Sequence, residues 1–259
     1  MTCTLINGDC LEEMDKLIRG GQKVDLVLTD VPYGTTACKW DNLIPFEDMW
    51  KCLDGITYET SPILLFGTQP FISELIHSNL QNFKYNLIWD KHSISNPFLA
   101  KKQPLRVHEE LAVFYKKPPY YNPQRIKRKW GDRPRTSESA KKWKTSHSDI
   151  FGGATPRSHY YEDDGTRYPQ SIISEFPCQM EECVNNFRFH PTQKPVALLQ
   201  WLIQNYTKDN DTVLDFTMGS GSTGVACLQT NRNFIGIELD EKYYNIAKER
   251  CKDYQSKLF

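Results

Sequence analysis

Short apolar segments alternate with segments of helical periodicity along this chain, and this alternation restricts the fold more than any other feature. The apolar segments are rich in β-branched and aromatic residues, as is typical of strands buried on both faces of a parallel sheet. We expect strands at 24–30, 63–67, 85–90, 111–115, 212–216 and 233–238. The pattern predicts an α/β protein with a doubly wound sheet and helices on both of its faces.

Helical periodicity fills the intervals between these strands, and we expect helices at 11–19, 45–55, 70–80, 195–206, 223–230 and 241–251. Three of them start at a proline (Pro45, Pro70 and Pro195). Proline suits the first turn of a helix because its missing N–H has no partner there. Residues 116–190 interrupt the alternation with a composition rich in Pro, Gly, Ser, Arg, Lys and Tyr. We expect this stretch to be a functional insertion or disordered.

Composition argues against several classes of protein. Mean hydropathy is −0.59, and no apolar run approaches the roughly 20 residues that span a bilayer. The chain starts without the basic and apolar stretches of a secretory signal, so we expect a soluble, cytoplasmic protein with no membrane partner. Its eight cysteines are dispersed, without a CxxC pair or zinc spacing. This predicts reduced thiols and no metal.

A glycine-rich turn follows one predicted strand and opens a predicted helix. Gly219, Gly221 and Gly224 have GxGxxG spacing, which in this context is typical of a nucleotide cofactor site, although a tight turn without a ligand is the alternative. Glu238 ends the next strand, 19 residues after Gly219, where an acid can accept both hydroxyls of a ribose. Asp215 adds a negative charge that disfavours a pyrophosphate and favours a sulfonium. The turn therefore favours S-adenosylmethionine over a nicotinamide dinucleotide.

The tetrapeptide Asp30–Tyr33 follows the first long strand, at the carboxyl edge where open α/β sheets bind ligands. The exocyclic amino group of a base is a weak nucleophile because its lone pair is delocalised into the ring. Asp30 and the carbonyl of Val31 can accept its two hydrogens and so localise the lone pair. Pro32 would stiffen the turn, and the ring of Tyr33 would hold the base flat. The tetrapeptide predicts methylation of an amine, with an ordinary Asp-x-Pro turn as the alternative.

A net charge of zero conceals one strongly basic segment. Residues 116–144 contain eleven basic and two acidic residues, a net charge of +9, so the rest of the chain carries −9. Two tyrosines and two tryptophans lie among these charges, a combination typical of nucleic-acid binding, with a solvated loop as the alternative. The candidate DNA contacts are Lys127, Arg128, Lys129, Arg133 and Arg135.

In their order along the chain, these motifs resemble the amino-group DNA methyltransferases, which methylate adenine N6 or cytosine N4. The order resembles the β arrangement of that family, with the catalytic tetrapeptide first, a recognition segment in the middle and the cofactor glycines last. Thr29–Gly34 resembles the catalytic DPPY motif, with Val31 where the family usually has proline. Asp215–Gly224 resembles the cofactor turn and Phe234–Asp240 the ribose-binding strand end.

Further segments extend the resemblance over nearly the whole chain. Asn7–Leu11 resembles the N-terminal cofactor segment, in which the acid, here Asp9, would meet the adenine of S-adenosylmethionine. His190–Pro195 resembles the motif that holds the methionine part of the cofactor, and it supplies Thr192 and Lys194. From the residues alone, Lys194 reaches either the cofactor carboxylate or solvent. Similar matches are found at Phe66–Phe71, Tyr85–Lys91 and Arg106–Lys116, and we expect His108 and Glu109 in a loop beside a strand.

The resemblance implies a Rossmann-like fold of the kind found in S-adenosylmethionine-dependent methyltransferases, with a mixed, mostly parallel sheet. Residues 1–115 and 191–259 would form the catalytic and cofactor-binding domain, and residues 116–190 an inserted DNA target-recognition region. The implied reaction is site-specific methylation of a flipped base in double-stranded DNA, by direct transfer without a covalent enzyme intermediate. The acid at the first position of the tetrapeptide is similar to adenine-N6 enzymes. The resemblance also leads us to expect a homodimer, a cognate restriction endonuclease as partner, and a location in the cytoplasm of a bacterial or phage-infected cell.

Other classes explain less of the sequence. Cytosine-N4 methylation is the first alternative, and a catalytically weakened DNA-binding relative is the second because Val31 replaces the usual proline. A nicotinamide dehydrogenase would account for the glycines but not for Asp30–Tyr33 or the basic segment. In methyltransferases that act on RNA or protein glutamine, the glycine turn usually precedes the tetrapeptide, opposite to the order here.

Overall fold

The computed structural model describes residues 1–34, 43–127, 165–178 and 193–256. Contacts divide the chain into two compact units, Met1–Asn122 with Gln170–Phe259, and Pro123–Pro169. In the described part of the second unit, the short strands β6 (Ile126–Lys127) and β7 (Thr166–Arg167) pair in antiparallel fashion. The division predicted from the sequence, with residues 116–190 as a recognition region, stays a prediction.

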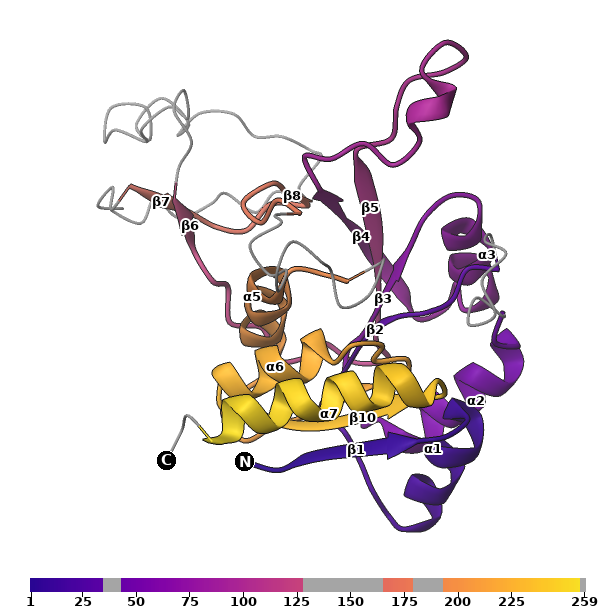
Figure 1. Cartoon of the computed structure of the whole chain (residues 1–259), viewed down its shortest axis with the longest axis vertical. Coiled ribbons are helices and arrows are strands. Elements are labelled where there is room, and N and C mark those ends of the chain that lie inside the picture. Colours follow the sequence, from indigo (N-terminus) through magenta and orange to yellow (C-terminus); the bar gives the residue numbers. More distant parts are fainter. Residues whose placement is uncertain (35–42, 128–164, 179–192, 257–259) are drawn as a thin grey trace, which may run out of the picture. The chain divides into compact units, whose positions relative to one another are not determined.

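The first unit is built on a mixed sheet of eight strands (Figure 1). In sheet order these are β1 (Cys3–Asn7), β10 (Asn233–Glu238), β9 (Thr212–Asp215), β2 (Leu26–Asp30), β3 (Ile63–Gly67), β5 (His108–Phe114), β4 (Phe83–Asp90) and β8 (Ile172–Ile173). Only β5 among them runs antiparallel to its neighbours, β3 and β4. The predicted α/β fold with a mostly parallel sheet is confirmed.

Helices cover both faces of this sheet (Figure 1). One layer contains α1 (Cys10–Arg19), α2 (Phe46–Ile56) and α3 (Phe71–Ser78), and the other contains α5 (Val196–Tyr206), α6 (Ser222–Gln229) and α7 (Glu241–Ser256). The prolines expected in the first turns of three helices, Pro45, Pro70 and Pro195, occupy the N-cap position instead. None of the described helices has the length and apolarity that crossing a membrane requires.

Several strands differ from the sequence prediction, which did not include the two-residue strands β6, β7 and β8. β1 was not predicted, because its side chains are only partly buried at the sheet edge and form no long apolar run. β5 begins at His108, so His108 and Glu109 are strand residues and their predicted place in a loop is wrong. β4 is fully buried on only one face, at Leu87 and Trp89 near its end, and Tyr85 within it remains 37% exposed.

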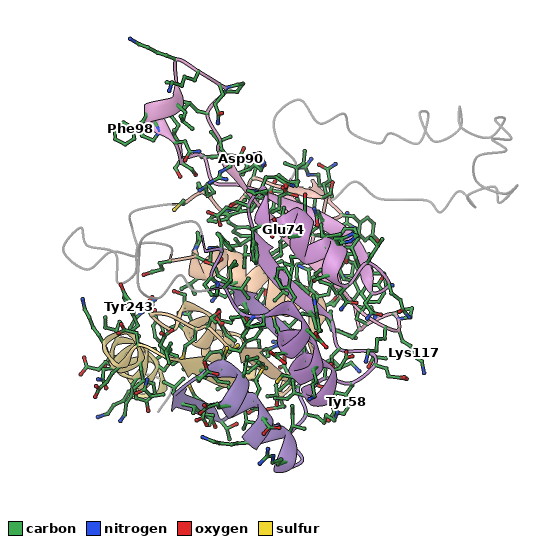
Figure 2. All side chains as sticks on the ribbon, turned by 90° about the vertical axis from the view of Figure 1, so that its right-hand side faces the viewer. Tyr58, Glu74, Asp90, Phe98, Lys117 and Tyr243 are labelled. Carbon is green, nitrogen blue, oxygen red and sulfur yellow. The ribbon has the colours of Figure 1, made fainter. Side chains whose placement is uncertain are left out.

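The connection between β4 and β5 extends well beyond the sheet. It comprises residues 91–107 and includes a single short 3-10 turn, η1 (Pro97–Leu99). Figure 2 shows this connection leaving the body of the unit at Asp90, with Phe98 far out along it. We refer to residues 91–107 as the arm.

The parallel strands bring distant parts of the sequence to one edge of the sheet. β1, β10, β9 and β2 are consecutive parallel neighbours, so the residues at their carboxyl ends meet. These ends carry acidic residues, namely Asp9, Asp30, Asp215 and Glu238. Beneath them lies an apolar core that includes Val27, Leu65, Leu214 and Ile237, each 0% exposed. A rigid framework therefore supports four carboxylates at the edge where ligands of such sheets bind.

Candidate active site

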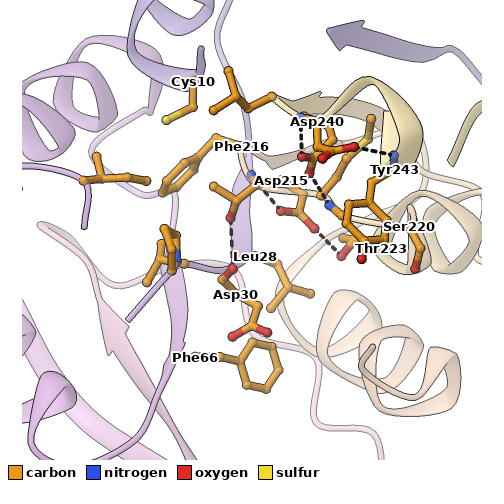
Figure 3. A pocket seen from close by; sticks show the side chains of 18 of the residues that line it. Cys10, Leu28, Asp30, Phe66, Asp215, Phe216, Ser220, Thr223, Asp240 and Tyr243 are labelled. Atoms are coloured by element: carbon orange, nitrogen blue, oxygen red, sulfur yellow. Dashed lines mark hydrogen bonds between the residues drawn. The ribbon is translucent and has the colours of Figure 1, made fainter. Parts of the chain in front are cut away.

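A pocket of about 570 Å³ lies at this carboxyl edge (Figure 3). It is lined by most of the residues that the sequence nominated, namely Asp9, Asp30, Val31, Pro32, Tyr33, Lys194, Asp215, Gly219 and Glu238. Gly221 lies between two lining residues, Ser220 and Ser222, and Thr192 lies outside the described residues. The predicted catalytic and cofactor segments, nearly 200 residues apart in the sequence, thus share one cavity of a size typical for small-molecule sites.

The glycine turn has a backbone that other residues adopt poorly. Gly219 has φ of +53° and Gly221 has φ of +79°, both in the left-handed region. A Cβ added to Gly221 would lie 2.8 Å from the Cβ of Ala247 in α7, so the turn also allows two elements to pack closely. Glycine is required at position 221 for both reasons.

Glu238 is held by the backbone on two sides. Its Oε2 accepts a hydrogen bond from the Gly219 amide at 2.8 Å, and its Oε1 accepts one from the Asp240 amide at 2.8 Å. Burial raises the pKa of Glu238, although these backbone donors act in the opposite direction. Each oxygen keeps a further lone pair, so a fixed carboxylate at the pocket wall can still accept the hydroxyls of a sugar.

Asp215 is buried among hydroxyl groups. Its Oδ2 accepts from Thr223 Oγ1 at 2.6 Å, and its Oδ1 accepts from Thr29 Oγ1 at 3.1 Å and from the Thr217 amide at 3.3 Å. Burial nevertheless raises the pKa of Asp215 to about 7, because water is excluded from the charged form. The negative charge that the sequence analysis assigned to Asp215 is therefore sensitive to pH near neutrality.

Thr217 connects the two predicted motifs directly. Its Oγ1 donates to the backbone carbonyl of Asp30 at 3.0 Å, while the Phe216 amide donates to Thr29 Oγ1 at 3.2 Å. These bonds tie the glycine turn to the end of β2, so the cofactor segment and the catalytic segment cannot shift independently. The sequence analysis missed Thr217, which is visible in the sequence only as a small polar residue inside the glycine turn.

The Asp30 carboxylate is engaged on both oxygens. The Tyr33 hydroxyl donates to Oδ1 and the Lys194 ammonium donates to Oδ2. Burial raises the pKa of Asp30, while the charge of Lys194 acts to lower it. The Tyr33 ring packs against Phe71 with centroids 5.1 Å apart. The aromatic ring and the carboxylate expected to receive a base are therefore positioned together.

Lys194 is 7% exposed, so the alternative of a solvated lysine is wrong. Its ammonium forms ion pairs with Asp30 and with Glu109 Oε2, the latter at 3.2 Å, and lies 5.0 Å from the centre of the Phe66 ring. Burial alone would lower the pKa of Lys194, but the two carboxylates raise it above its usual value. The predicted contact of Lys194 with the cofactor stays a prediction.

Behind Lys194 lies a third ion pair, between Glu109 and Lys91, that the sequence analysis missed. Glu109 Oε1 accepts from Lys91 Nζ at 3.0 Å, and Lys91 also donates to Ser95 Oγ at 2.6 Å. Burial tends to raise the pKa of Glu109, but Lys194 and Lys91 hold it below its usual range. These ion pairs form a chain of alternating charges, which runs through Asp30, Lys194, Glu109 and Lys91 and which we call the charge relay. Extending the 111–115 strand backward would have placed Glu109 on it.

Three other nominated residues have clear structural settings. Val31 is 4% exposed and packs in the hydrophobic core, so an apolar contact holds the turn where the family usually has proline. Asp9 accepts from the amides of Leu11 at 2.9 Å and Glu12 at 3.2 Å, and so caps α1 while it lines the pocket. Lys127 is exposed on β6. The other candidate DNA contacts, Arg128, Lys129, Arg133 and Arg135, lie outside the described residues.

Comparison with known proteins agrees with this geometry. A family model described as DNA methylase matches residues 24–249. The type II methyltransferase M.HinfI of Haemophilus influenzae is 44% identical over 279 aligned positions, which cover 96% of this chain and 68% of that protein. Matches to two further methylases are local, and the chain spans only 30% and 23% of their lengths.

Solved structures with related folds cover nearly all of the chain. A complex of M1.HpyAVI with S-adenosylmethionine has a TM-score of 0.62 at 24% identity and covers 96% of this chain and 100% of that one. The PvuII DNA methyltransferase, described as cytosine-N4-specific, has a TM-score of 0.65 at 13% identity, with 99% and 91% covered. At these identities, the likeness establishes the fold.

Proposed function

Because this chain belongs to the N6/N4 DNA methylase family, we propose that it transfers a methyl group from S-adenosylmethionine to the exocyclic amino group of a base in double-stranded DNA. One observation carries the proposal. The tetrapeptide Asp30–Tyr33 and the glycine turn line the same pocket and are joined by the hydrogen bond from Thr217 to the Asp30 carbonyl.

The cofactor half of the pocket fits a nucleoside with a cationic substituent. The fixed oxygens of Glu238 suit the two ribose hydroxyls, and Asp9 and Asp215 add acidic groups on the same wall. Lys194 and Thr192 are proposed to hold the methionine part. When bound, S-adenosylmethionine supplies a methyl group on a positively charged sulfur. A carboxylate-rich pocket is a favourable environment for such a cation.

The base half of the pocket would activate the amine. Each Asp30 oxygen accepts one hydrogen bond in the structure and keeps a further lone pair, with which it would accept an amino hydrogen of the base. The Val31 carbonyl would accept the other hydrogen, and the Tyr33 ring would stack on the flipped base. The amine nitrogen would then attack the methyl carbon that the sulfonium supplies, with the electron pair of the broken C–S bond remaining on sulfur, and the extra proton of the nitrogen would pass to solvent water. Alignment of the two reacting groups would supply much of the rate acceleration.

No thiol is required for this chemistry. Cys10 lines the pocket, but burial raises the pKa of its thiol to about 12, so it stays protonated and weakly nucleophilic at neutral pH. This property supports direct transfer from cofactor to base, without a covalent enzyme intermediate.

Within the family, we propose adenine N6 as the target atom. The acid at the first position of the tetrapeptide, Asp30, supports this choice by its resemblance to adenine-N6 enzymes. Cytosine N4 is the alternative, favoured by the fold shared with the PvuII enzyme. Residues 116–190 are proposed as the recognition region. We further propose that the protein acts as a homodimer in the cytoplasm and is accompanied by a cognate restriction endonuclease.

The test is to express the chain in cells that lack DNA methylation and to sequence the DNA for modified bases. Mass analysis of the digested nucleosides then distinguishes N6-methyladenine from N4-methylcytosine. We expect N6-methyladenine at one short recurring sequence, and no modification with Asp30→Ala, which removes a hydrogen bond needed in the transition state and costs on the order of 10²-fold or more. Unmodified DNA from cells that contain the folded wild-type protein would contradict the proposal.

A further inference from the structure

The arm, residues 91–107, leaves the sheet at the edge that carries the pocket. β4 is antiparallel to β5, and β5 is antiparallel to β3, so β4 runs in the same direction as β3 and β2. Asp90 at the end of β4 and Asp30 at the end of β2 therefore point to the same side of the molecule. Anything that delivers a base to Asp30 approaches from the side where the arm projects (Figure 2).

The arm is an ordered extension of the β4–β5 hairpin. The Lys91 amide donates to the Val107 carbonyl at 2.9 Å, and the Ser95 amide donates to the Arg106 carbonyl at 2.9 Å. Near its tip, the Lys102 amide donates to the Leu99 carbonyl at 2.8 Å and closes a turn. Because its base also contains Lys91, the arm begins at the charge relay that ends on Asp30.

The side chains of the arm combine apolar exposure with positive charge. Phe98 is 97% exposed and Ile94 is 56% exposed, although burying such groups is normally favourable. Residues 91–107 contain four basic residues and no acidic residue, in a chain with zero net charge. Two of these, Lys101 and Lys102, are exposed beside Phe98. Apolar side chains beside the exposed Lys101 and Lys102 are complementary to duplex DNA, which carries phosphates on its outside and stacked bases inside.

We propose that the arm is a DNA-binding element that assists base flipping. Lys101 and Lys102 contact phosphates, and Phe98 inserts beside the target base when that base leaves the stack. Unstacking a base costs free energy, and an apolar side chain that fills the gap recovers part of it. This inference rests on the proposed function and adds to it the element that holds the duplex open.

The phosphate contacts are tested by the salt dependence of binding. Wild type, the pair Lys101→Gln with Lys102→Gln, and a control pair, Lys248→Gln with Lys252→Gln on α7, are titrated with a labelled duplex at several salt concentrations. Each phosphate contact contributes a slope of about −0.9 to log affinity against log salt. We expect the arm pair to flatten the slope by about one to two and the control pair to leave it unchanged. Equal slopes for all three proteins would overturn the phosphate contacts.

The role of Phe98 is tested with a duplex that carries the methylated sequence found by sequencing. Methyl transfer is compared for Phe98→Ala and for Tyr58→Ala, whose ring is 50% exposed at the opposite edge of the sheet, before β3. On the paired duplex, we expect Phe98→Ala to be about tenfold slower and Tyr58→Ala to match wild type. On a duplex with a mismatch opposite the target base, Phe98→Ala should recover, because a mismatched base is more easily unstacked. Wild-type rates on the paired duplex, or an equal defect on both, would overturn the role.

Two further results separate this inference from others. If wild type methylates DNA and the arm variants match it in slope and rate, the arm inference fails while the proposed function stands. If wild type methylates no DNA, the proposed function fails first. Sedimentation of Phe98→Ala and of wild type measures self-association, and so tests whether the arm contacts a second copy of this chain instead of DNA. Loss of self-association in the variant with unchanged DNA binding would identify the arm as a contact between copies of this chain and overturn the inference.

Discussion

Asp30 is shared between two neighbours, and this sharing has a consequence for the reaction. In the structure, its carboxylate accepts hydrogen bonds from Tyr33 and Lys194, and in the proposed reaction it also accepts a hydrogen of the base. Lys194 has a second carboxylate within reach, Glu109 at 3.2 Å. We interpret Glu109 as a positioning residue, because it offers Lys194 another partner when the base arrives at Asp30.

The first prediction concerns this positioning. Without the charge of Glu109, Lys194 should bind Asp30 more tightly, so Glu109→Gln should lower kcat by about tenfold, the size typical of one lost charged hydrogen bond, with little change in the KM for the cofactor. Glu109→Asp should recover part of the rate. The loss should also disappear when Glu109→Gln is added to Lys194→Met, since both act through the same ion pair. Additive losses in the double variant would contradict the positioning role.

The second prediction concerns the charge of Asp215. Its pKa is raised to about 7 in the folded protein, from an ordinary value of 3.8. The folded state therefore binds more protons than the unfolded state between these values, so its contribution to stability falls as pH rises from about 4 to about 7 and is constant above. Each unit of pKa shift corresponds to about 1.4 kcal/mol.

Asp215→Asn removes this dependence, and urea unfolding at pH 5, 6, 7 and 8 measures it. We expect the free energy of unfolding of wild type, minus that of the variant, to decrease from pH 5 to pH 7 and then to level off. Asp30 and Glu238, whose pKa values are also raised by burial, are present in both proteins and largely cancel. A difference that stays constant over this range would contradict a raised pKa of Asp215.

At the scale of elements, the glycine turn before α6 performs two tasks. It lines the part of the pocket proposed to hold the cofactor, and it lets α6 pack against α7. Gly21 offers a matched control, because it too has a positive φ, +77°, but has open space where a Cβ would be.

The third prediction compares these two glycines. Gly21→Ala incurs only the left-handed backbone cost, roughly 1–2 kcal/mol, whereas Gly221→Ala also places a Cβ 2.8 Å from that of Ala247. We expect Gly221→Ala to be the less stable variant in thermal unfolding and to lose affinity for S-adenosylmethionine, which calorimetry measures. Gly21→Ala should keep that affinity. Equal stability and unchanged cofactor affinity in both variants would remove the turn from the cofactor site.

At the scale of the whole molecule, we propose that cofactor binding and DNA target recognition belong to different parts of the chain. Most of the proposed cofactor residues follow strands of the first unit, and the predicted recognition region lies mostly in another stretch of sequence. Variants in one part should therefore leave the function of the other intact.

The fourth prediction tests this separation. Replacing Lys127, Arg128 and Lys129 with glutamine should flatten the salt dependence of DNA binding by roughly one to three units of slope, according to how many contact phosphate. Cofactor affinity should equal that of wild type, because the glycine turn lies elsewhere in the chain. A solvated basic loop would change neither quantity. If cofactor affinity fell together with the slope, the assignment to separate parts would be wrong.

Local sequence determined a large share of this protein. The apolar runs that became β2, β3, β9 and β10 and the helical periodicity between them act over a few residues each, so a short window contains their signal. The same is true of the tetrapeptide and of the glycine turn. Their conformations depend on proline, on glycine and on the strand that precedes them, all of which are adjacent in the sequence.

Tertiary structure decided which of these residues act together. The antiparallel placement of β5 sets Glu109 beside Lys194 and Lys91, and the pairing of β2 with β9 sets Thr217 beside Asp30. Lys194 and Asp30 are 164 positions apart in the sequence. Burying either charge without the other would be strongly destabilising, and a short sequence segment cannot show that the two meet. The sequence identified most of the side chains of the candidate site. Which of them contact one another depends on strand order, because burial and electrostatic energy are set by the residues that surround each group in the folded protein.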